Sequence, residues 1–191
     1  MNLTSYELEQ YVRDMASHPE WWGYLVRHDP NERLYEQLAW TDDLNCWLIC
    51  WAAEHETGFH DHDGSAVAVI VLDGEIREER LRLIGDSGIL PRGQEYGPGN
   101  VIRLGPNDIH NVKHAGTDLS VSIHAYSPPL VKMGSYGFGP DKELRRLPMF
   151  SSEKLRPLEA AALAAIEEES DHDGTLSAWH DYPHGEQPIS T

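Results

Sequence analysis

The feature that most limits the possible folds of this chain is a series of short strand-like segments separated by turn residues. Between residues 34 and 126 of the 191-residue chain, apolar and aromatic stretches alternate with stretches rich in Gly, Pro, Asn and Asp. Such a series favours a mostly β fold, either an antiparallel sandwich or a small barrel. We expect Asp73-Gly74 to be a turn and 86–99 to be a loop. The expected strands are 34–40, 44–52, 65–72, 76–84, 101–104, 109–113 and 119–126.

The two ends of the chain have helical patterns. Thr4 followed by Glu7 has the form of a capping box, and Pro19 suits the first turn of a second short helix. We expect four residues of that second helix to pack in the core: Trp21, Trp22, Tyr24 and Leu25. The pattern predicts one domain at 1–150 with a helical segment at 1–30, then a helix at 152–169 and a loose acidic tail within 151–191.

Composition excludes some partners. The net charge is −17, from 15 basic and 32 acidic residues. Nucleic acids and anionic membranes attract positive charge, so we expect neither as a partner. No apolar run approaches a membrane span and no signal pattern opens the chain, so a cytoplasmic protein is expected. Cys46 and Cys50 lie about 13 Å apart along one strand at ~3.3 Å per residue, which is too far for a disulfide.

A possible metal site lies at the end of one expected strand. Residues two apart on a strand share a face, so His60 and His62 would aim at one point. His110, from a neighbouring strand, would complete three protein ligands and leave coordination positions open for chemistry. His114 is a rival third ligand if the strand register shifts. A polar core of stacked imidazoles without metal is the structural alternative.

These histidines and the nearby glycines resemble the cupins, small double-sheet barrels with metal in the barrel mouth. The resemblance covers roughly 50–125 and includes Gly74 and the segment from Gly105 to His110. The usual cupin glutamate is replaced by Val67, so the resemblance implies a neutral three-histidine set. Asp61 and Asp63 flank the pair and are expected to make solvent or outer contacts.

A second resemblance is narrower. Gly-Phe-His-Asp-His-Asp-Gly-Ser at 58–65 and Ser-Ile-His-Ala-Tyr-Ser-Pro-Pro at 122–129 resemble the cysteine dioxygenase family. The family implies Fe(II) held by the three histidines, a small thiol carboxylate and O₂ as substrates, a sulfinic acid product and a cis Ser127-Pro128 bond. It also implies a hydrogen-bonded catalytic row of Ser122, His124 and Tyr126. Val67 occupies the position of a crosslinking cysteine, so Tyr126 is expected to be a free phenol.

The substrate is left open at this stage. The family's carboxylate-binding arginine aligns with Gln37, beside Tyr35, as in the subgroup that resembles 3-mercaptopropionate dioxygenase. Arg33 shares that strand face and could supply the charge instead. Cysteine, 3-mercaptopropionate and mercaptosuccinate all remain candidates. Outside this class, the alternatives are an isomerase, a carbon–carbon-cleaving dioxygenase, and a small-anion sensor without turnover. The sequence leaves open a monomer or a small homo-oligomer.

Overall fold

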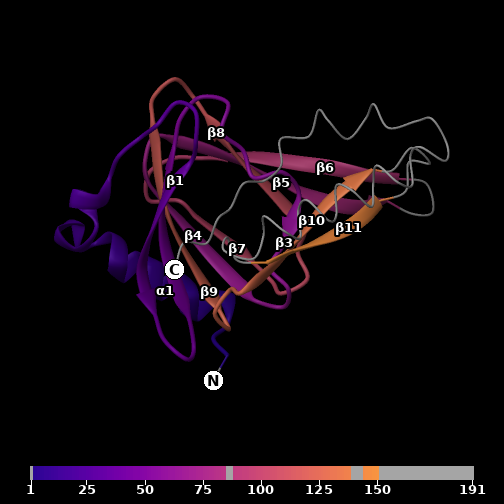
Figure 1. Cartoon of the computed structure of the whole chain (residues 1–191), viewed down its shortest axis with the longest axis horizontal. Coiled ribbons are helices and arrows are strands. Elements are labelled where there is room, and N and C mark those ends of the chain that lie inside the picture. Colours follow the sequence, from indigo (N-terminus) through magenta and orange to yellow (C-terminus); the bar gives the residue numbers. More distant parts are fainter. Residues whose placement is uncertain (1, 85–87, 139–143, 151–191) are drawn as a thin grey trace.

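Two antiparallel sheets face each other in the computed structural model, which describes residues 2–84, 88–138 and 144–150 (Figure 1). The first has the order β1 (Leu34–Trp40), β2 (Asn45–Trp51), β9 (Ser120–Ser127), β4 (Ala66–Asp73) and β7 (Val101–Leu104). The second has the order β11 (Leu144–Phe150), β10 (Lys132–Phe138), β3 (His60–Asp61), β8 (His110–Ala115), β5 (Glu75–Ile84) and β6 (Gly88–Tyr96). The expected antiparallel β architecture is confirmed. The predicted helix at 152–169 and the tail lie outside the described residues.

The central strands of the first sheet are buried on both faces. In β2, Cys46, Leu48 and Cys50 join one apolar cluster. Trp47, Ile49 and Trp51 join the other. This alternation is the period of two expected for a strand between two packed layers. It explains why β2 and β4 are continuous apolar runs rather than alternating ones. The first cluster lies under α1, and the second fills the space between the sheets.

The N-terminal helix α1 (Ser5–Ala16) begins as the sequence predicts. Thr4 and Glu7 form the full capping box, and the buried residues of α1 are Leu8, Val12 and Met15. The expected second helix is instead two single 3₁₀ turns, η1 (Pro19–Trp21) and η2 (Gly23–Leu25). Because each is only one turn long, neither can present a continuous apolar stripe to the core.

The expected core position of this segment is therefore only partly right. Trp22 and Leu25 pack against the core beneath α1. Trp21 is 46% exposed and Tyr24 is 78% exposed, so the prediction that they are core residues is wrong. None of the helices in the described residues is long and apolar enough to cross a membrane. Cys46 and Cys50 are free, as expected.

The stretch expected as a loop at 86–99 contains strand β6, so that prediction is wrong. β6 pairs with β5 along its length, with Pro91 opposite Leu81. An edge strand tolerates proline, because one side of its backbone needs no partner. The same composition that indicates a loop therefore also fits an edge strand. β10 and β11 beyond residue 127 were not predicted, and β10 pairs with the short strand β3.

Gly74 lies where the chain passes from one sheet to the other. Asp73-Gly74 is a turn as expected, but β4 and β5 belong to different sheets and do not form a hairpin. Gly74 has φ +63°, and an added Cβ would overlap Leu119 O and approach Ser120 Oγ to 2.6 Å. Only glycine satisfies both the left-handed backbone and the close approach.

Gly74→Ala should therefore destabilise the fold more than Gly99→Ala. Gly99 also has positive φ, at +79°, but no atom lies within 4 Å of its added Cβ. Both variants carry the left-handed strain of roughly 1–2 kcal/mol, and only Gly74→Ala adds a clash of about 1–3 kcal/mol. Urea unfolding of the two variants measures the difference. Equal losses would show that the packing around Gly74 relaxes freely.

Candidate metal centre

Three buried imidazoles meet between the sheets. His60 lies on β3, His62 follows that strand directly, and His110 begins β8, opposite His60 in the strand register. Their ring centroids are 4.5 to 5.0 Å apart. One nitrogen from each ring lies within 4.8 Å of those from the other two. The structure thus brings together the three histidines singled out in the sequence.

The facing nitrogens fit one metal ion. Nε2 of His110 and Nε2 of His62 are 3.3 Å apart. Two nitrogens held about 2.1 Å from one ion at roughly 90–110° would be about 3.0–3.4 Å apart. His60 directs its Nδ1 to Gly58 O at 3.0 Å, which leaves its Nε2 as the ligand atom. Neutral imidazole donors suit iron, zinc, copper and nickel.

The protonation states also favour a metal. Burial lowers the pKa of His60 to about 4. Burial and neighbouring rings place the pKa values of His62 and His110 well below the ordinary value of 6.5. All three rings are therefore neutral at pH 7. Neutral imidazole is the form that binds a cation, so no proton has to leave the folded site before binding.

A polar network on the outer side of β3 fixes the loop that carries the ligands. Arg146 Nε donates to Asp61 Oδ2 at 2.6 Å, and Arg146 Nη2 donates to Asp63 Oδ1 at 2.8 Å. Tyr136 also donates to Asp61, at 2.6 Å. Burial alone would raise the pKa of Asp61, but these bonds hold it well below its usual range. Both aspartates point away from the histidines and make outer contacts.

A second polar row crosses the cavity wall on β9. Ser122 Oγ lies 2.8 Å from His124 Nε2, and Tyr126 Oη lies 3.4 Å from His124 Nδ1. Trp51 Nε1 donates to Ser122 Oγ at 2.8 Å. Burial lowers the pKa of His124 to about 3 and raises that of Tyr126, so both are neutral at pH 7.

The indole of Trp51 is compatible with one consistent direction for this row. Indole can only donate, so Ser122 must accept from it. If Ser122 then donates to His124 Nε2, every buried proton in the row has an acceptor. His124 carries its own proton on Nδ1 and donates it to the oxygen of Tyr126. The hydroxyl proton of Tyr126 is then available to the cavity.

The cavity between the two sheets is lined by both polar and apolar residues. Its polar residues are His60, His110, His124, Tyr126 and Thr57. Tyr126 also lies beside His62, with ring centroids 5.3 Å apart. The remaining lining residues are Tyr35, Trp47, Ile49, Val112, Leu130 and Met133. A small ligand here would meet the imidazoles and the phenol together with apolar side chains.

The substrate-binding residues predicted in and just before β1 lie at different depths. Tyr35 lines the cavity. Arg33 is buried, and its guanidinium lies 4.9 Å from the ring centroid of Trp51 and donates to Glu56 O. Its charge helps to lower the pKa values of His60 and His124, so it acts electrostatically on the site. Gln37 is exposed opposite Trp47 and is not among the lining residues.

Two further expectations concern neighbours of the site. His114, the rival ligand, is bonded through Nε2 to Asp118 O at 2.7 Å and is not part of the imidazole cluster. Val67 is fully buried and pairs with Tyr126 across β4 and β9. The peptide bond between Ser127 and Pro128 is cis, as the resemblance implies.

One buried acid was missed by sequence reasoning. The alternation of charged and apolar residues in β5 predicted a solvent-exposed charged face, but Glu78 is only 3% exposed. It shares a strand face with buried Ile76, because the two are two residues apart. The two-residue spacing from Ile76 was the sequence signal that could have identified Glu78 as buried. Trp51 was likewise expected only as an apolar strand residue, since its donor role depends on the β2–β9 register.

Comparisons with known proteins identify the family of this chain. Residues 5–137 match the cysteine dioxygenase type I family, and the chain belongs to that family. It is 29% identical over 140 residues to cysteine dioxygenase type 1 of Danio rerio, covering 64% of this chain and 65% of that protein. It is 25% identical to the Bos taurus protein over 139 residues, covering 64% of each. The chain thus matches slightly less than two thirds of the length of these relatives.

The fold also resembles solved cupin structures. A cupin superfamily protein from Desulfitobacterium hafniense aligns with a TM-score of 0.43 and 18% identity, over 56% of this chain and 87% of that chain. The family match and the two facing antiparallel sheets described above carry the fold assignment, and this alignment adds no argument to it. The fold class expected from the sequence is confirmed.

The metal-free protein should lose stability as the pH falls from about 6.5 toward 4. The folded pKa values of His60 and His124, about 4 and about 3, lie below the ordinary 6.5, so the unfolded chain binds more protons in that window. Each buried histidine contributes a slope of up to about 1.4 kcal/mol per pH unit. The free energy of unfolding in urea, measured at several pH values, tests this. A stability that is constant or rises on acidification would contradict buried neutral imidazoles.

Proposed function

We propose that this protein is a mononuclear non-haem Fe(II) thiol dioxygenase that converts a small thiol carboxylate and O₂ to a sulfinic acid. One observation carries the proposal. Three imidazoles with converging nitrogens share a cavity with a hydrogen-bonded Ser–His–Tyr row, in a chain of the cysteine dioxygenase family. Zinc would fit the same donors, and iron is assigned because the proposed reaction requires activation of O₂.

The overall reaction is RSH + O₂ → RSO₂H. Both oxygen atoms are transferred to sulfur, which loses four electrons while O₂ gains four, so no other reductant is needed. When bound by His60, His62 and His110, Fe(II) would supply adjacent open positions for the thiol sulfur and O₂. Holding the two reactants side by side removes most of the entropic cost of their encounter. The remaining steps depend on the protein's own residues.

The two ends of the substrate meet different surroundings. The sulfur belongs at the imidazoles, where a cation would lower the pKa of the thiol. We assign the carboxylate to Tyr35, which lines the cavity, with the buried Arg33 acting through its charge from outside the lining; Gln37 is exposed and also outside the lining. Arg33 contributes its positive charge, and Tyr35 contributes its hydroxyl at the wall. The apolar wall of Trp47, Leu130 and Met133 limits water access and strengthens these interactions.

Tyr126 is the proposed proton donor within the cavity. If Ser122 donates to His124 Nε2, His124 donates from Nδ1 to Tyr126 and leaves the hydroxyl proton of Tyr126 pointing away from His124. Burial raises the pKa of Tyr126, so it stays protonated at neutral pH. It can therefore donate a hydrogen bond to the substrate and return a proton to the developing sulfinate.

Oxygen uptake across a panel of thiols tests the function. Iron-loaded protein with cysteine, 3-mercaptopropionate or mercaptosuccinate should consume one O₂ per sulfinate formed for at least one of them. The matched alcohols, serine, 3-hydroxypropionate and malate, should give no uptake. His110→Ala should abolish metal retention and uptake together. Stoichiometric metal without thiol-dependent uptake on any of the three thiols would overturn the proposal and favour a non-catalytic anion-binding cupin.

Tyr126→Phe should keep its metal and lose turnover. The variant removes only the hydroxyl, so the imidazole cluster is unchanged, and loss of a proton donor lowers kcat by on the order of 100-fold. Tyr24→Phe is the matched control, because Tyr24 is exposed and far from the cavity lining. Metal content and steady-state kinetics are measured for both. Full activity in Tyr126→Phe would remove the phenol from the mechanism.

A further inference from the structure

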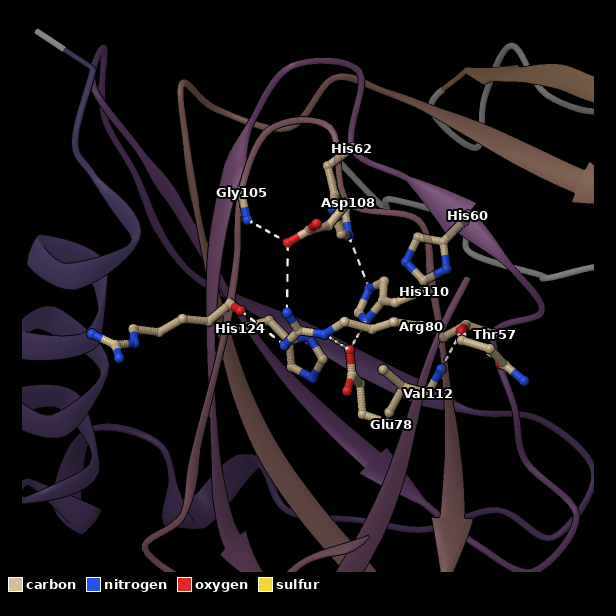
Figure 2. Close-up of polar contacts among 12 residues, drawn as sticks. Thr57, His60, His62, Glu78, Arg80, Gly105, Asp108, His110, Val112 and His124 are labelled. Carbon is tan, nitrogen blue, oxygen red and sulfur yellow. Dashed lines mark hydrogen bonds and ion pairs between the residues drawn. The ribbon is translucent and has the colours of Figure 1, made fainter. Parts of the chain in front are cut away.

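A buried carboxylate lies behind one of the proposed ligands. Glu78 is 3% exposed on β5, and its Oε1 is 3.7 Å from Nδ1 of His110 (Figure 2). The other nitrogen of that ring, Nε2, faces His62 and the metal position. Nδ1 of His110 is buried and has no hydrogen-bond partner within the described ranges. The carboxylate is therefore next to the one atom of His110 that still needs an acceptor.

A network of fixed contacts holds Glu78 in this place. Arg80 Nε donates to Glu78 Oε1 at 2.5 Å, and Arg80 Nη2 donates to Arg103 O at 2.9 Å. Arg80 Nη1 lies 3.6 Å from Asp108 Oδ2, which accepts from Gly105 N at 2.8 Å. Figure 2 shows these side chains as a continuous group behind His110. The ion pair with Arg80 keeps the Glu78 carboxylate beside His110.

We propose that Glu78 is a positioning residue of the metal centre: it accepts the Nδ1 proton of His110 and supplies the negative charge that the three-histidine set lacks. A separation of 3.7 Å is longer than a hydrogen bond, and a shift of about 1 Å or less closes it. A carboxylate behind a ligating histidine fixes the ring and raises its basicity. The inference rests only on the metal-binding part of the proposed function, not on thiol oxidation.

The proposed ligands differ in the group that orients the ring. His60 is oriented by a neutral backbone carbonyl, Gly58 O. Val67 occupies the position where cupins commonly place a ligating glutamate, and it is fully buried. Glu78 is the carboxylate next to Nδ1 of His110, one layer outside the ligands, whereas Asp61 is bonded to Arg146 and Tyr136 on the outer side of β3. Glu78 would offset part of the positive charge of the metal ion through His110. The open coordination positions would stay free for substrate.

Glu78→Gln should weaken Zn(II) binding, measured with the purified full chain in competition with a chromophoric chelator. The substitution keeps the side-chain shape and removes the charge. We expect the dissociation constant to rise on the order of 10–100-fold, as for other carboxylates behind metal-binding histidines. Glu79→Gln is the matched control, because Glu79 bonds Arg77 and Lys113 at 3.0 and 3.1 Å on the other strand face. A folded Glu78→Gln protein with unchanged affinity would overturn the proposal.

A measurement on the unaltered protein covers the case in which Glu78→Gln fails to fold. In the Zn(II)-loaded protein labelled with ¹⁵N-histidine, the Nδ1 proton of His110 should be shifted downfield and slow to exchange with water. An unprotonated Nδ1, or a proton exchanging as in free histidine, would overturn the role of Glu78. If the unaltered chain binds no Zn(II) at all, the metal centre itself fails. Binding without sulfinate formation would leave this inference standing and remove only the proposed reaction.

Discussion

The site depends on burying three uncharged imidazoles so that their nitrogens converge. Burial penalises the charged form of each ring and holds the pKa values of His60, His62 and His110 below the ordinary range. Three lone pairs brought together in a dry cavity, with no proton to share, repel one another weakly and attract any cation strongly. The pairing of His60 with His110 across β3 and β8 fixes this arrangement. A one-residue slip would turn His60 to the outer face of the sheet.

The rest of the fold holds this short pairing in register. β3 contains only His60 and Asp61, too little to fix its own position. From outside, Arg146 and Tyr136 hold Asp61 by charge-assisted bonds. From within, Arg80 donates a hydrogen bond to Glu78, and Glu78 lies behind His110. The ligands are thus fixed from both faces of the second sheet, while the first sheet contributes the Ser–His–Tyr row. A site positioned by rigid strands in this way keeps its geometry while small ligands come and go.

Most of the first sheet and the convergence of the three histidines could be predicted from the sequence, and the reasons are local. The His-x-His spacing determines which rings share a strand face, and the run from Ala66 to Asp73 indicates a strand buried on both sides. The capping box at Thr4 is a local signal as well. β6 could not be predicted in this way, because an edge strand needs few local signals and tolerates Gly and Pro. Nor could the exposure of Trp21, which depends on where two short turns meet the core.

The roles of Glu78 and Trp51 required the structure for a different reason. A charged residue in an alternating strand is expected on the solvent face, and only the packing of β5 against β8 shows that Glu78 faces inward. The direction of the hydrogen bonds through Ser122 depends on a contact between β2 and β9, 71 residues apart in the chain. For Gln37, the sequence and the structure indicate different positions. Sequence alignment places it at the substrate, whereas the bulge in β1 between Gln37 and Ala39 accompanies an exposed side chain.

Anomalous diffraction from crystals of the metal-loaded protein, at the absorption edge of the bound element, tests the central claim most directly. The account predicts one peak per chain, about 2.0–2.2 Å from one nitrogen of each of His60, His62 and His110, with no protein carboxylate among the ligands. A peak elsewhere, an ion whose coordination is completed by protein atoms, or fully loaded crystals with these three rings turned apart would contradict it.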